Sequence, residues 1–274
     1  MSAERFGGFD VLFDSSSGEV LTSGDDAIER LHGGPVRLAS DGVYANFVAS
    51  LDGVAALRDR SRSSADISRG HVGDRFMMGV LRACADAIVV GAGTVRAHPD
   101  GRWTPGAAYP AGADDLRALR RSLGVAGHPR LVVVSGGGDL GPAHPGIVDA
   151  LVVTTGRGAR TVPAGHEAQF ELAVVAGDDV EVADLLGILR SRGYRRILTE
   201  GGPRLMGQLL GADAIGTMFL TVSPVVAGRT DDRARPGMVD GVAFEPTGFR
   251  EATLTSVRRS RDHLFLRYEL SGAS

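Results

Sequence analysis

Residues 76–94 read FMMGVLRACADAIVVGAGT, and this stretch contains the unit that decides the fold. Its first half, from Phe76 to Cys84, repeats apolar side chains at the spacing of one helical face. Its second half is a short apolar strand over 87–90 that ends in a glycine-rich turn at Gly91. A helix and an apolar strand that alternate along a chain are typical of a parallel sheet covered by helices on both faces.

The same alternation continues along the chain and defines its fold class. Because no helix separates the last strands, we predict an α/β fold with a mostly parallel central sheet, helices on both faces and an antiparallel edge. We expect an N-terminal extension over 1–35 and one domain over 36–274. Asp178 is the expected cap of the helix that starts at 182, and Gly193 its expected end. The further strands are predicted over 43–49, 131–134, 150–154, 172–175, 197–199, 218–222, 254–257 and 264–268, and the further helices over 114–123, 182–189 and 203–210.

The composition excludes several classes of partner. The 274 residues are 43% hydrophobic and carry a formal net charge of −3, which suits a soluble globular protein and argues against nucleic-acid binding. No continuous apolar stretch is long enough to span a membrane, and the N-terminus lacks the pattern of a signal peptide. We therefore expect a cytoplasmic protein without a membrane partner.

The counts of lysine and cysteine exclude whole reaction classes. All 30 basic residues are arginine, so the chain has no lysine for a P-loop or for a Schiff base with pyridoxal phosphate. Cys84 is the single cysteine and no two histidines are close in sequence, so we expect no metal site. Cys84 lies on the apolar helical face, where a core position is the favoured interpretation.

The segment Gly91-Ala92-Gly93-Thr94 is the first candidate ligand loop. Ligands of parallel sheets bind beyond the carboxyl ends of the strands, where glycines let the backbone approach a phosphate and Thr94 supplies a hydroxyl. Arg96 stands where the third glycine of the dinucleotide fingerprint would be, so the motif is incomplete. A plain glycine-rich turn stays an equal alternative.

The segment Thr199-Glu200-Gly201-Gly202-Pro203 is more specific. Pro203 suits the first turn of a helix, whose free N–H groups and dipole favour a pyrophosphate. Glu200 beside this anion site indicates contact with a polar substrate or a nicotinamide amide. The alternative is a tight turn with a solvated Glu200.

The segment Asn46–Gly53 is the third candidate. Strand alternation places Asn46, Val48 and Ser50 on one face, and Asp52-Gly53 then turns out of the sheet. A buried Asn46 needs hydrogen-bond partners, so it is either structural or a ligand contact. Asp52 is either a turn residue or part of the site.

Three weaker segments complete the candidates. The loops Ser135–Gly138 and Thr154–Arg157 follow strands and are candidates for the adenosine half of a nucleotide, with Arg157 or Arg160 on a 2′-phosphate. Each is equally well explained as a surface loop. The run Arg58–Arg62 is either a solvated loop or a contact for a substrate phosphate.

These motifs occur together, and in this order, in a known family. The sequence resembles the riboflavin-biosynthesis pyrimidine reductases, the dihydrofolate-reductase-like half of bifunctional deaminase-reductases. The resemblance implies a dihydrofolate-reductase-like fold with a C-terminal antiparallel hairpin, NADPH as hydride donor and a homodimer. It also implies a stand-alone reductase, because the first 40 residues are too short for the deaminase domain and one cysteine cannot form its zinc site. The matching segments are Asn46–Gly53, Leu81–Val95, Ile197–Leu210 and Leu220–Val225, within a resemblance that spans 36–270.

The resemblance assigns residues to the site as well. Family cofactor contacts fall on Thr94, His98 and the helix start from Gly202 to Gln208, and substrate contacts fall on Arg82 and Glu200, with Asn46 and Asp52 in the first motif. Two positions depart from the family pattern, since Asn46 often corresponds to a lysine and His98 to an acidic residue. With the glycine loops included, the cofactor candidates are Gly91, Gly93, Thr94, His98, Ser135, Thr155, Arg157, Gly201, Gly202, Pro203, Arg204, Leu205 and Met206.

We therefore expect an NADPH-dependent reductase that transfers a hydride to a heterocyclic small molecule, with 5-amino-6-(5-phosphoribosylamino)uracil as the best candidate. Arg82 would bind the phosphate or the polar edge of the substrate, and Asn46 and Ser50 would contact the substrate. Glu200 and Asp52 would orient the ring, and either would relay a proton if burial raised its pKa. Two alternatives stay open: a pterin or folate-type reductase, in which Glu200 or Asp52 grips the amino-bearing edge, and a non-catalytic dimeric nucleotide-binding module.

Overall fold

The computed structural model describes residues 6–22, 26–57, 63–125, 127–141, 144–162, 169–230 and 235–271. The strands are β1 (Asp10–Asp14), β2 (Glu19–Val20), β3 (Arg37–Leu38), β4 (Gly42–Ala49), β5 (Ala87–Gly91), β6 (Arg130–Ser135), β7 (Leu151–Thr155), β8 (Glu171–Val175), β9 (Arg196–Thr199), β10 (Ile215–Val222), β11 (Ala252–Ser260) and β12 (His263–Leu270). The α-helices are α1 (Ala27–His32), α2 (Ser63–Ile67), α3 (Val72–Cys84), α4 (Ala92–Ala97), α5 (Pro105–Ala108), α6 (Ala113–Ser122), α7 (Gly156–Ala159), α8 (Val182–Ser191) and α9 (Pro203–Gly211). The 3₁₀ turns are η1 (Pro110–Gly112), η2 (Pro145–Ile147) and η3 (Pro246–Gly248).

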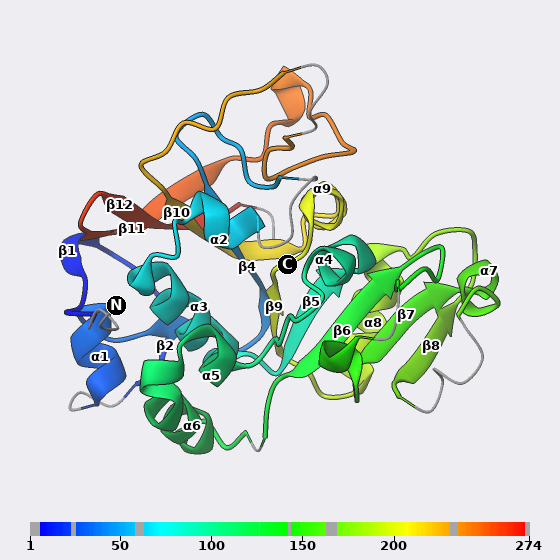
Figure 1. Ribbon diagram of the computed structural model, residues 1–274, viewed down its shortest axis with the longest axis horizontal. Helices are drawn as coiled ribbons and strands as arrows, with labels where there is room; N and C mark the ends of the chain where they lie inside the picture. The colour runs from blue at the N-terminus through cyan, green and yellow to red at the C-terminus, as the bar shows by residue number, and fades with distance from the viewer. Residues whose placement is uncertain are drawn as a thin grey trace.

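One large sheet organises the described residues (Figure 1). Its strand order is β1-β11-β12-β10-β4-β9-β5-β6-β7-β8. The strands from β10 to β8 run parallel, whereas β12, β11 and β1 pair antiparallel at the other edge. The predicted fold class is confirmed, because helices separate the parallel strands and the chain ends in the antiparallel hairpin β11–β12.

Strand β5 shows why both faces of the sheet are covered. Ile88 and Val90 pack in a core that includes side chains of α3 and α6. Ala87 and Val89 point the other way, into a core formed with α8 and α9. All four side chains are buried, so the strand is apolar at every position instead of alternating with polar residues.

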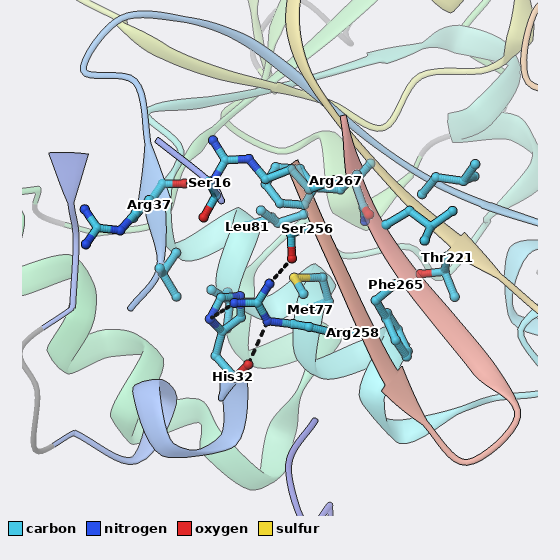
Figure 2. Close-up of a pocket in the computed structure, with 16 residues that line it drawn as sticks. Ser16, His32, Arg37, Met77, Leu81, Thr221, Ser256, Arg258, Phe265 and Arg267 are labelled. Atoms are coloured by element: carbon cyan, nitrogen blue, oxygen red, sulfur yellow. Dashed lines mark hydrogen bonds between the residues drawn. The ribbon is translucent and has the colours of Figure 1, made fainter. Parts of the chain in front are cut away.

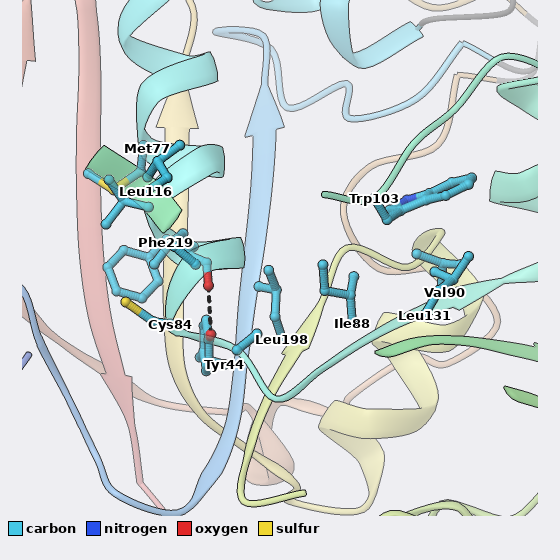
Figure 3. Close-up of a cluster of buried hydrophobic side chains, with 14 of the residues drawn as sticks. Tyr44, Met77, Cys84, Ile88, Val90, Trp103, Leu116, Leu131, Leu198 and Phe219 are labelled. Atoms are coloured by element: carbon cyan, nitrogen blue, oxygen red, sulfur yellow. Dashed lines mark hydrogen bonds between the residues drawn. The ribbon is translucent and has the colours of Figure 1, made fainter. Parts of the chain in front are cut away.

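Helix α3 packs on β4 and β10 through its apolar face (Figure 3). Phe76 and Cys84 are fully buried there, and the Tyr44 hydroxyl of β4 donates a hydrogen bond of 2.8 Å to the carbonyl of Leu81. Burial raises the pKa of the Cys84 thiol to about 12, so the thiol stays protonated and is not a nucleophile. The predicted core role of Cys84 is confirmed.

Residues before the predicted boundary at 35 share in this packing. β1 extends the sheet beside β11, and Phe6, Phe9 and Ile28 belong to the same core as α3. This segment therefore adds a strand and core side chains to the domain. The boundary itself stays a prediction.

Helix α8 begins differently from the prediction. Glu181, not Asp178, occupies the N-cap position, and its side chain makes no capping hydrogen bond. Gly193 lies just beyond the end of the helix at φ +81°, the left-handed conformation that glycine adopts without strain. No helix in the described ranges is long and apolar enough to cross a lipid bilayer.

Candidate active site

A cavity of about 320 Å³ lies where the parallel strands β4, β9 and β5 end. Its walls come from β4, the inner face of α3, α4 and the loop after β9, together with segments 64–70 and 101–108. In the sheet, β9 lies between β4 and β5. The chain leaves β9 toward β10 and leaves β5 toward β6, so these two connections run to opposite sides. Open α/β sheets bind ligands at the point where the connections diverge in this way. The location agrees with the sequence argument that ligand loops follow strands.

The cavity brings together candidates from three predicted motifs. The predicted residues that line it are Asn46, Arg82, Thr94, His98, Glu200, Gly201, Gly202 and Pro203. The predicted residues outside its lining are Ser50, Asp52, Gly91, Gly93, Ser135, Thr155, Arg157, Arg204, Leu205 and Met206.

A buried ion pair joins Arg82 of α3 to Glu200 after β9. The Arg82 Nε donates to Oε1 at 2.8 Å and Nη2 donates to Oε2 at 2.6 Å, and the side chains are only 8% and 10% exposed. The Arg82 Nη1 donates to the carbonyl oxygens of Arg102 and Thr104 at 3.1 and 3.4 Å. These bonds occupy most of the guanidinium, so Arg82 holds Glu200 in a fixed orientation and has little capacity left for a phosphate.

Asp52 is a turn residue, which is one of its two predicted roles. Its carboxylate accepts hydrogen bonds from the Ser50 hydroxyl at 2.6 Å and from the N–H groups of Ala227 and Gly228 at 3.0 and 2.7 Å. The bond from Ser50 and those from the backbone hold the pKa of Asp52 well below its usual range. A proton relay through a raised pKa is therefore wrong for Asp52. Ser50 is buried and accepts a bond from the Val54 N–H at 2.9 Å, so both side chains organise this turn.

The loop after β9 has the features of an anion cradle. Gly202 is the N-cap of α9 and brings no side chain to its first N–H groups, while Pro203 fills the first turn. A Cβ on Gly202 would lie 3.4 Å from the Thr94 Oγ1, so this loop closely approaches α4. A Cβ on Gly201 would lie 2.6 Å from Leu205 Cδ2, so glycine is needed for the turn to pack. The positive end of the α9 dipole thus meets the cavity beside the Thr94 hydroxyl.

His98 ends α4 and lines the cavity near Thr94. Its Nδ1 hydrogen-bonds to the Thr94 carbonyl at 2.9 Å, and its own carbonyl is 2.6 Å from Nε2 of His144. Gly91 caps the same helix without a side-chain bond, and Gly93 is exposed. The α4 helix therefore presents a hydroxyl and an imidazole to the cavity, not its glycines.

The residues after Pro203 turn away from the cavity. Leu205 and Met206 are buried in the core under α9, and the Arg204 side chain is 81% exposed, with its Nε 3.9 Å from Asp240. The start of α9 faces the cavity and the rest of the helix packs on the sheet. The run Arg58–Arg62 lies outside the described residues.

The loops after β6 and β7 lie at the same edge of the sheet. The Thr155 hydroxyl caps α7 by accepting from the Gly158 N–H at 3.0 Å. Gly138 crosses Gly158 so closely that a Cβ would lie 1.9 Å from its carbonyl oxygen. Ser135 is buried at the end of β6, whereas Arg157 is exposed on α7. Their predicted contact with an adenosine group stays a prediction.

Asp74 lines the cavity and was not among the residues predicted from the sequence, nor were Arg75, Arg102 and Trp103. Asp74 lines the cavity from the first turn of α3 and is only 5% exposed. Burial raises the pKa of its carboxyl to about 6, hydrogen bonds with the side chains of Thr221 and Ser68 oppose the rise, and the charge of Glu200 adds to it. A buried acid that titrates near neutral pH in a cavity is a functional-site signal.

The sequence carried a sign of this residue. Asp74 precedes Met77 by three residues and Leu81 by seven, so it lies on the apolar stripe of α3. A carboxylate on an apolar stripe, in the first turn of a helix that returns from a strand end, falls at the ligand edge of the sheet. Asp74 was missed because the helical pattern was used only to find the core.

Asn46 faces the cavity and also a second, small one of about 20 Å³ (Figure 2). In the small cavity Arg258 donates to the carbonyl of His32 at 2.9 Å and to the Ser256 hydroxyl, and it pairs with Asp14 at 2.7 Å. That space suits no more than a water molecule, so its polar groups are structural. Across the described chain the Asn46 side-chain amide has no hydrogen-bond partner, which leaves it available to a ligand in the larger cavity.

The sequence of this domain matches one family over most of its length. The match to the RibD C-terminal domain covers residues 42–264. The chain belongs to this family. The matched range contains every residue that lines the larger cavity, so the whole cavity lies within the matched domain.

Individual relatives agree with this assignment. The chain is 32% identical over 206 residues to the 2,5-diamino-6-ribosylamino-4(3H)-pyrimidinone 5′-phosphate reductase of Archaeoglobus fulgidus, covering 74% of this chain and 87% of the relative. Its fold resembles a pyrimidine reductase-like protein of Corynebacterium diphtheriae, with a TM-score of 0.67, 22% identity, and coverage of 84% and 92%. It also resembles the Thermotoga maritima deaminase/5-amino-6-(5-phosphoribosylamino)uracil reductase, with a TM-score of 0.62, 19% identity, and coverage of 84% and 57%.

Proposed function

We propose that this protein is an NADPH-dependent reductase that transfers a hydride to a ribosylaminopyrimidine 5′-phosphate. One observation carries the proposal: the glycine-rich start of α9 (Gly201–Pro203) and the Arg82–Glu200 ion pair line a single cavity. An anionic cofactor and a polar heterocycle can therefore meet there. Membership of the family and the activity of the archaeal relative support a reductase of the riboflavin pathway.

Several residues fit the cofactor. Bound NADPH would supply a hydride from C4 of its nicotinamide ring. The first N–H groups of α9, from Gly202 onward, would hold its phosphates, with Thr94 and His98 on the opposite wall. The exposed guanidinium of Arg157 would meet a 2′-phosphate, and Ser135 and Thr155 would contact the adenosine half.

The substrate phosphate has better partners than Arg82. Arg75 and Arg102 both line the cavity and are exposed, so they stand where it meets solvent. The Arg75 Nε donates to the Ala108 carbonyl at 3.0 Å, which fixes the side chain and leaves its terminal nitrogens available. We assign the 5′-phosphate to these two guanidinium groups because planar N–H pairs bind phosphate well.

The chemical step reduces the open-chain imine of the ribosylamino group. The hydride adds to C1′, the C=N π bond breaks, and the nitrogen takes one proton, which gives a ribitylamino product and NADP⁺. Glu200, held by Arg82, and the unpaired amide of Asn46 orient the substrate. Trp103 is buried and lines the cavity, so it helps to exclude water from the reacting atoms.

Two forms of the pyrimidine substrate are candidates, and so are a different substrate class and a non-catalytic role. The resemblance favours the uracil form, whereas the archaeal relative is named for the form that retains a 2-amino group. A pterin or folate-type substrate is the second candidate function, because Asp74 is a buried carboxylate of the kind that an amino-bearing edge needs. A non-catalytic nucleotide-binding module is the remaining alternative.

Two measurements test the proposal. Nicotinamide fluorescence should report NADPH binding. Absence of binding at millimolar cofactor would refute both the pyrimidine reductase and the pterin or folate-type reductase. NADPH oxidation is then followed with both pyrimidine phosphates and with dihydrofolate. Turnover of a pyrimidine phosphate supports the proposal, turnover of dihydrofolate alone favours the pterin class, and binding without any turnover favours the module.

We also propose a cytoplasmic homodimer. β1 is an edge strand of the sheet, and its Val11, Leu12 and Phe13 are 41%, 54% and 46% exposed. Exposed apolar residues on an edge strand favour pairing with a second copy. Light scattering of the purified protein should give twice the mass of the chain, and a monomer would contradict the proposal.

A further inference from the structure

Asp74 is held in a way that leaves part of its carboxylate open to the cavity. Its hydrogen bonds come from the side chains of Ser68 and Thr221, both of which are buried. A carboxylate accepts about four hydrogen bonds, so two hydroxyl partners orient it without satisfying it. Asp74 also lines the cavity, which makes a ligand the natural source of the missing donors.

A structural role does not explain this arrangement. Acidic residues in the first turn of a helix usually stabilise the helix by facing its free N–H groups. In α3 the Nδ1 of His71 accepts the bond from the Gly73 N–H instead. Burial raises the pKa of the Asp74 carboxyl to about 6 and the charge of Glu200 adds to the rise, so its ionised form is disfavoured.

We propose that Asp74 recognises the pyrimidine ring and that its carboxylate selects a ring with an amino group at C2 over the corresponding uracil. A 2-amino-4-oxopyrimidine offers two adjacent donors, the exocyclic amino group and the neighbouring ring N–H. A carboxylate accepts both at once, in a bidentate, charge-assisted pair. Glu200, the other carboxylate of the cavity lining, already has its charge paired by the Arg82 guanidinium, which donates to both of its oxygens, so Asp74 is the better partner for a pair of donors.

The uracil ring keeps the ring N–H donor but replaces the neighbouring amino group by a carbonyl. Its C2 carbonyl is an acceptor, so it would face a second acceptor on Asp74, and this repulsion discriminates against the uracil. An asparagine in place of Asp74 offers one donor and one acceptor, which complements the uracil edge and mismatches the 2-amino edge. The single change Asp74→Asn should therefore invert the preference.

This inference rests on the proposed reductase function and is tested by steady-state turnover at pH 8. The substrates are 2,5-diamino-6-ribosylamino-4(3H)-pyrimidinone 5′-phosphate and 5-amino-6-(5-phosphoribosylamino)uracil, each with NADPH. The wild type should prefer the 2-amino substrate in kcat/KM by at least about a hundredfold, because sites that hydrogen-bond a substrate group strongly reject analogues without it. In Asp74→Asn the ratio should fall by at least about thirtyfold.

The outcomes distinguish a failure of the proposed reductase function from a failure of the proposed role of Asp74. Turnover of neither substrate by the wild type overturns the proposed function and this inference with it. Turnover with a preference for the uracil, or with an unchanged ratio in Asp74→Asn, overturns the role of Asp74 alone. Asp66→Asn is the matched control, because Asp66 is exposed on α2 and does not line the cavity, and its ratio should equal that of the wild type. The wild-type preference is a test that needs no variant to fold.

Discussion

The replacement Asp74→Asn should make the protein more stable at pH 8 while it impairs recognition of the substrate. Burial raises the pKa of Asp74 from 3.8 to about 6. Folding is therefore favoured by protonation, and the stability present below pH 3.8 is lost as the pH rises through 6. One pKa unit corresponds to about 1.4 kcal/mol, so the ionised Asp74 costs about 3 kcal/mol at pH 8.

Asparagine removes this penalty because it has the same shape and no charge. It keeps one acceptor and adds a donor for the hydroxyls of Thr221 and Ser68, so those contacts survive. A gain of about 3 kcal/mol corresponds to a rise in Tm of roughly 6–12 °C for a domain of this size. Stability gained where function is lost is the signature of a residue retained for activity.

Denaturant unfolding at pH 8, 6 and 4 measures the difference between the two proteins. The gap in unfolding free energy should be largest at pH 8, nearly as large at pH 6 and small at pH 4, because it closes between the folded pKa of about 6 and the unfolded pKa of 3.8. Buried histidines titrate alike in both proteins and cancel in this difference. A gap that does not change with pH, or a variant less stable than the wild type at pH 8, would show that Asp74 is not a strained, buried acid.

Three further variants probe other parts of the molecule. Glu200→Gln should cut turnover at least tenfold and leave NADPH affinity within about twofold if, as proposed, Glu200 contacts the substrate and not the cofactor; equal losses in both would refute this division. Gly202→Ala should weaken NADPH binding by about tenfold in a fluorescence titration, since its Cβ would enter the gap beside Thr94, whereas Gly211→Ala, with open space around it, should not. The buried His32, whose pKa burial lowers to about 3, is neutral in the fold and titrates near 6.5 when unfolded, so its contribution to stability should fall by about 2.5 kcal/mol between pH 7 and 4.5, opposite in sign to that of Asp74. The difference in unfolding free energy between the wild type and His32→Gln measures this fall, and a difference that does not change over that range would contradict it.

The sequence predicted the sheet better than it predicted the site. Strands such as β5 are easily recognised in the sequence, because both of their faces are buried and every residue is apolar. The alternation of such strands with helices then predicts that they run parallel. The start of α9 was also predictable, since Gly202 occupies its N-cap position and Pro203 its first turn. These features depend on short stretches of chain, which a sequence displays directly.

Contacts between distant segments were not predictable in the same way. Arg82 and Glu200 are 118 positions apart, and neither segment of the sequence shows that the two side chains form an ion pair. Asp52 has a carboxylate in a promising motif, yet the backbone of Ala227 and Gly228 binds it. Roles that depend on which groups are already paired require the fold.

The uncharged Asn46 explains why Asp74 can remain an unpaired acid. Asn46 lies opposite Phe219 on β10, two residues before Thr221, which bonds to Asp74. A lysine at position 46 would put an ammonium group in the same cavity, and a nearby cation lowers the pKa of a carboxyl. We expect Asn46→Lys to lower the pKa of Asp74 toward its ordinary value. The stabilisation by Asp74→Asn at pH 8 should then shrink by at least half in the Asn46→Lys background, as a double-mutant cycle of unfolding free energies would show. If the two effects are additive instead, Asn46 and Asp74 are electrostatically independent, and the absence of lysine at position 46 has no bearing on the acid.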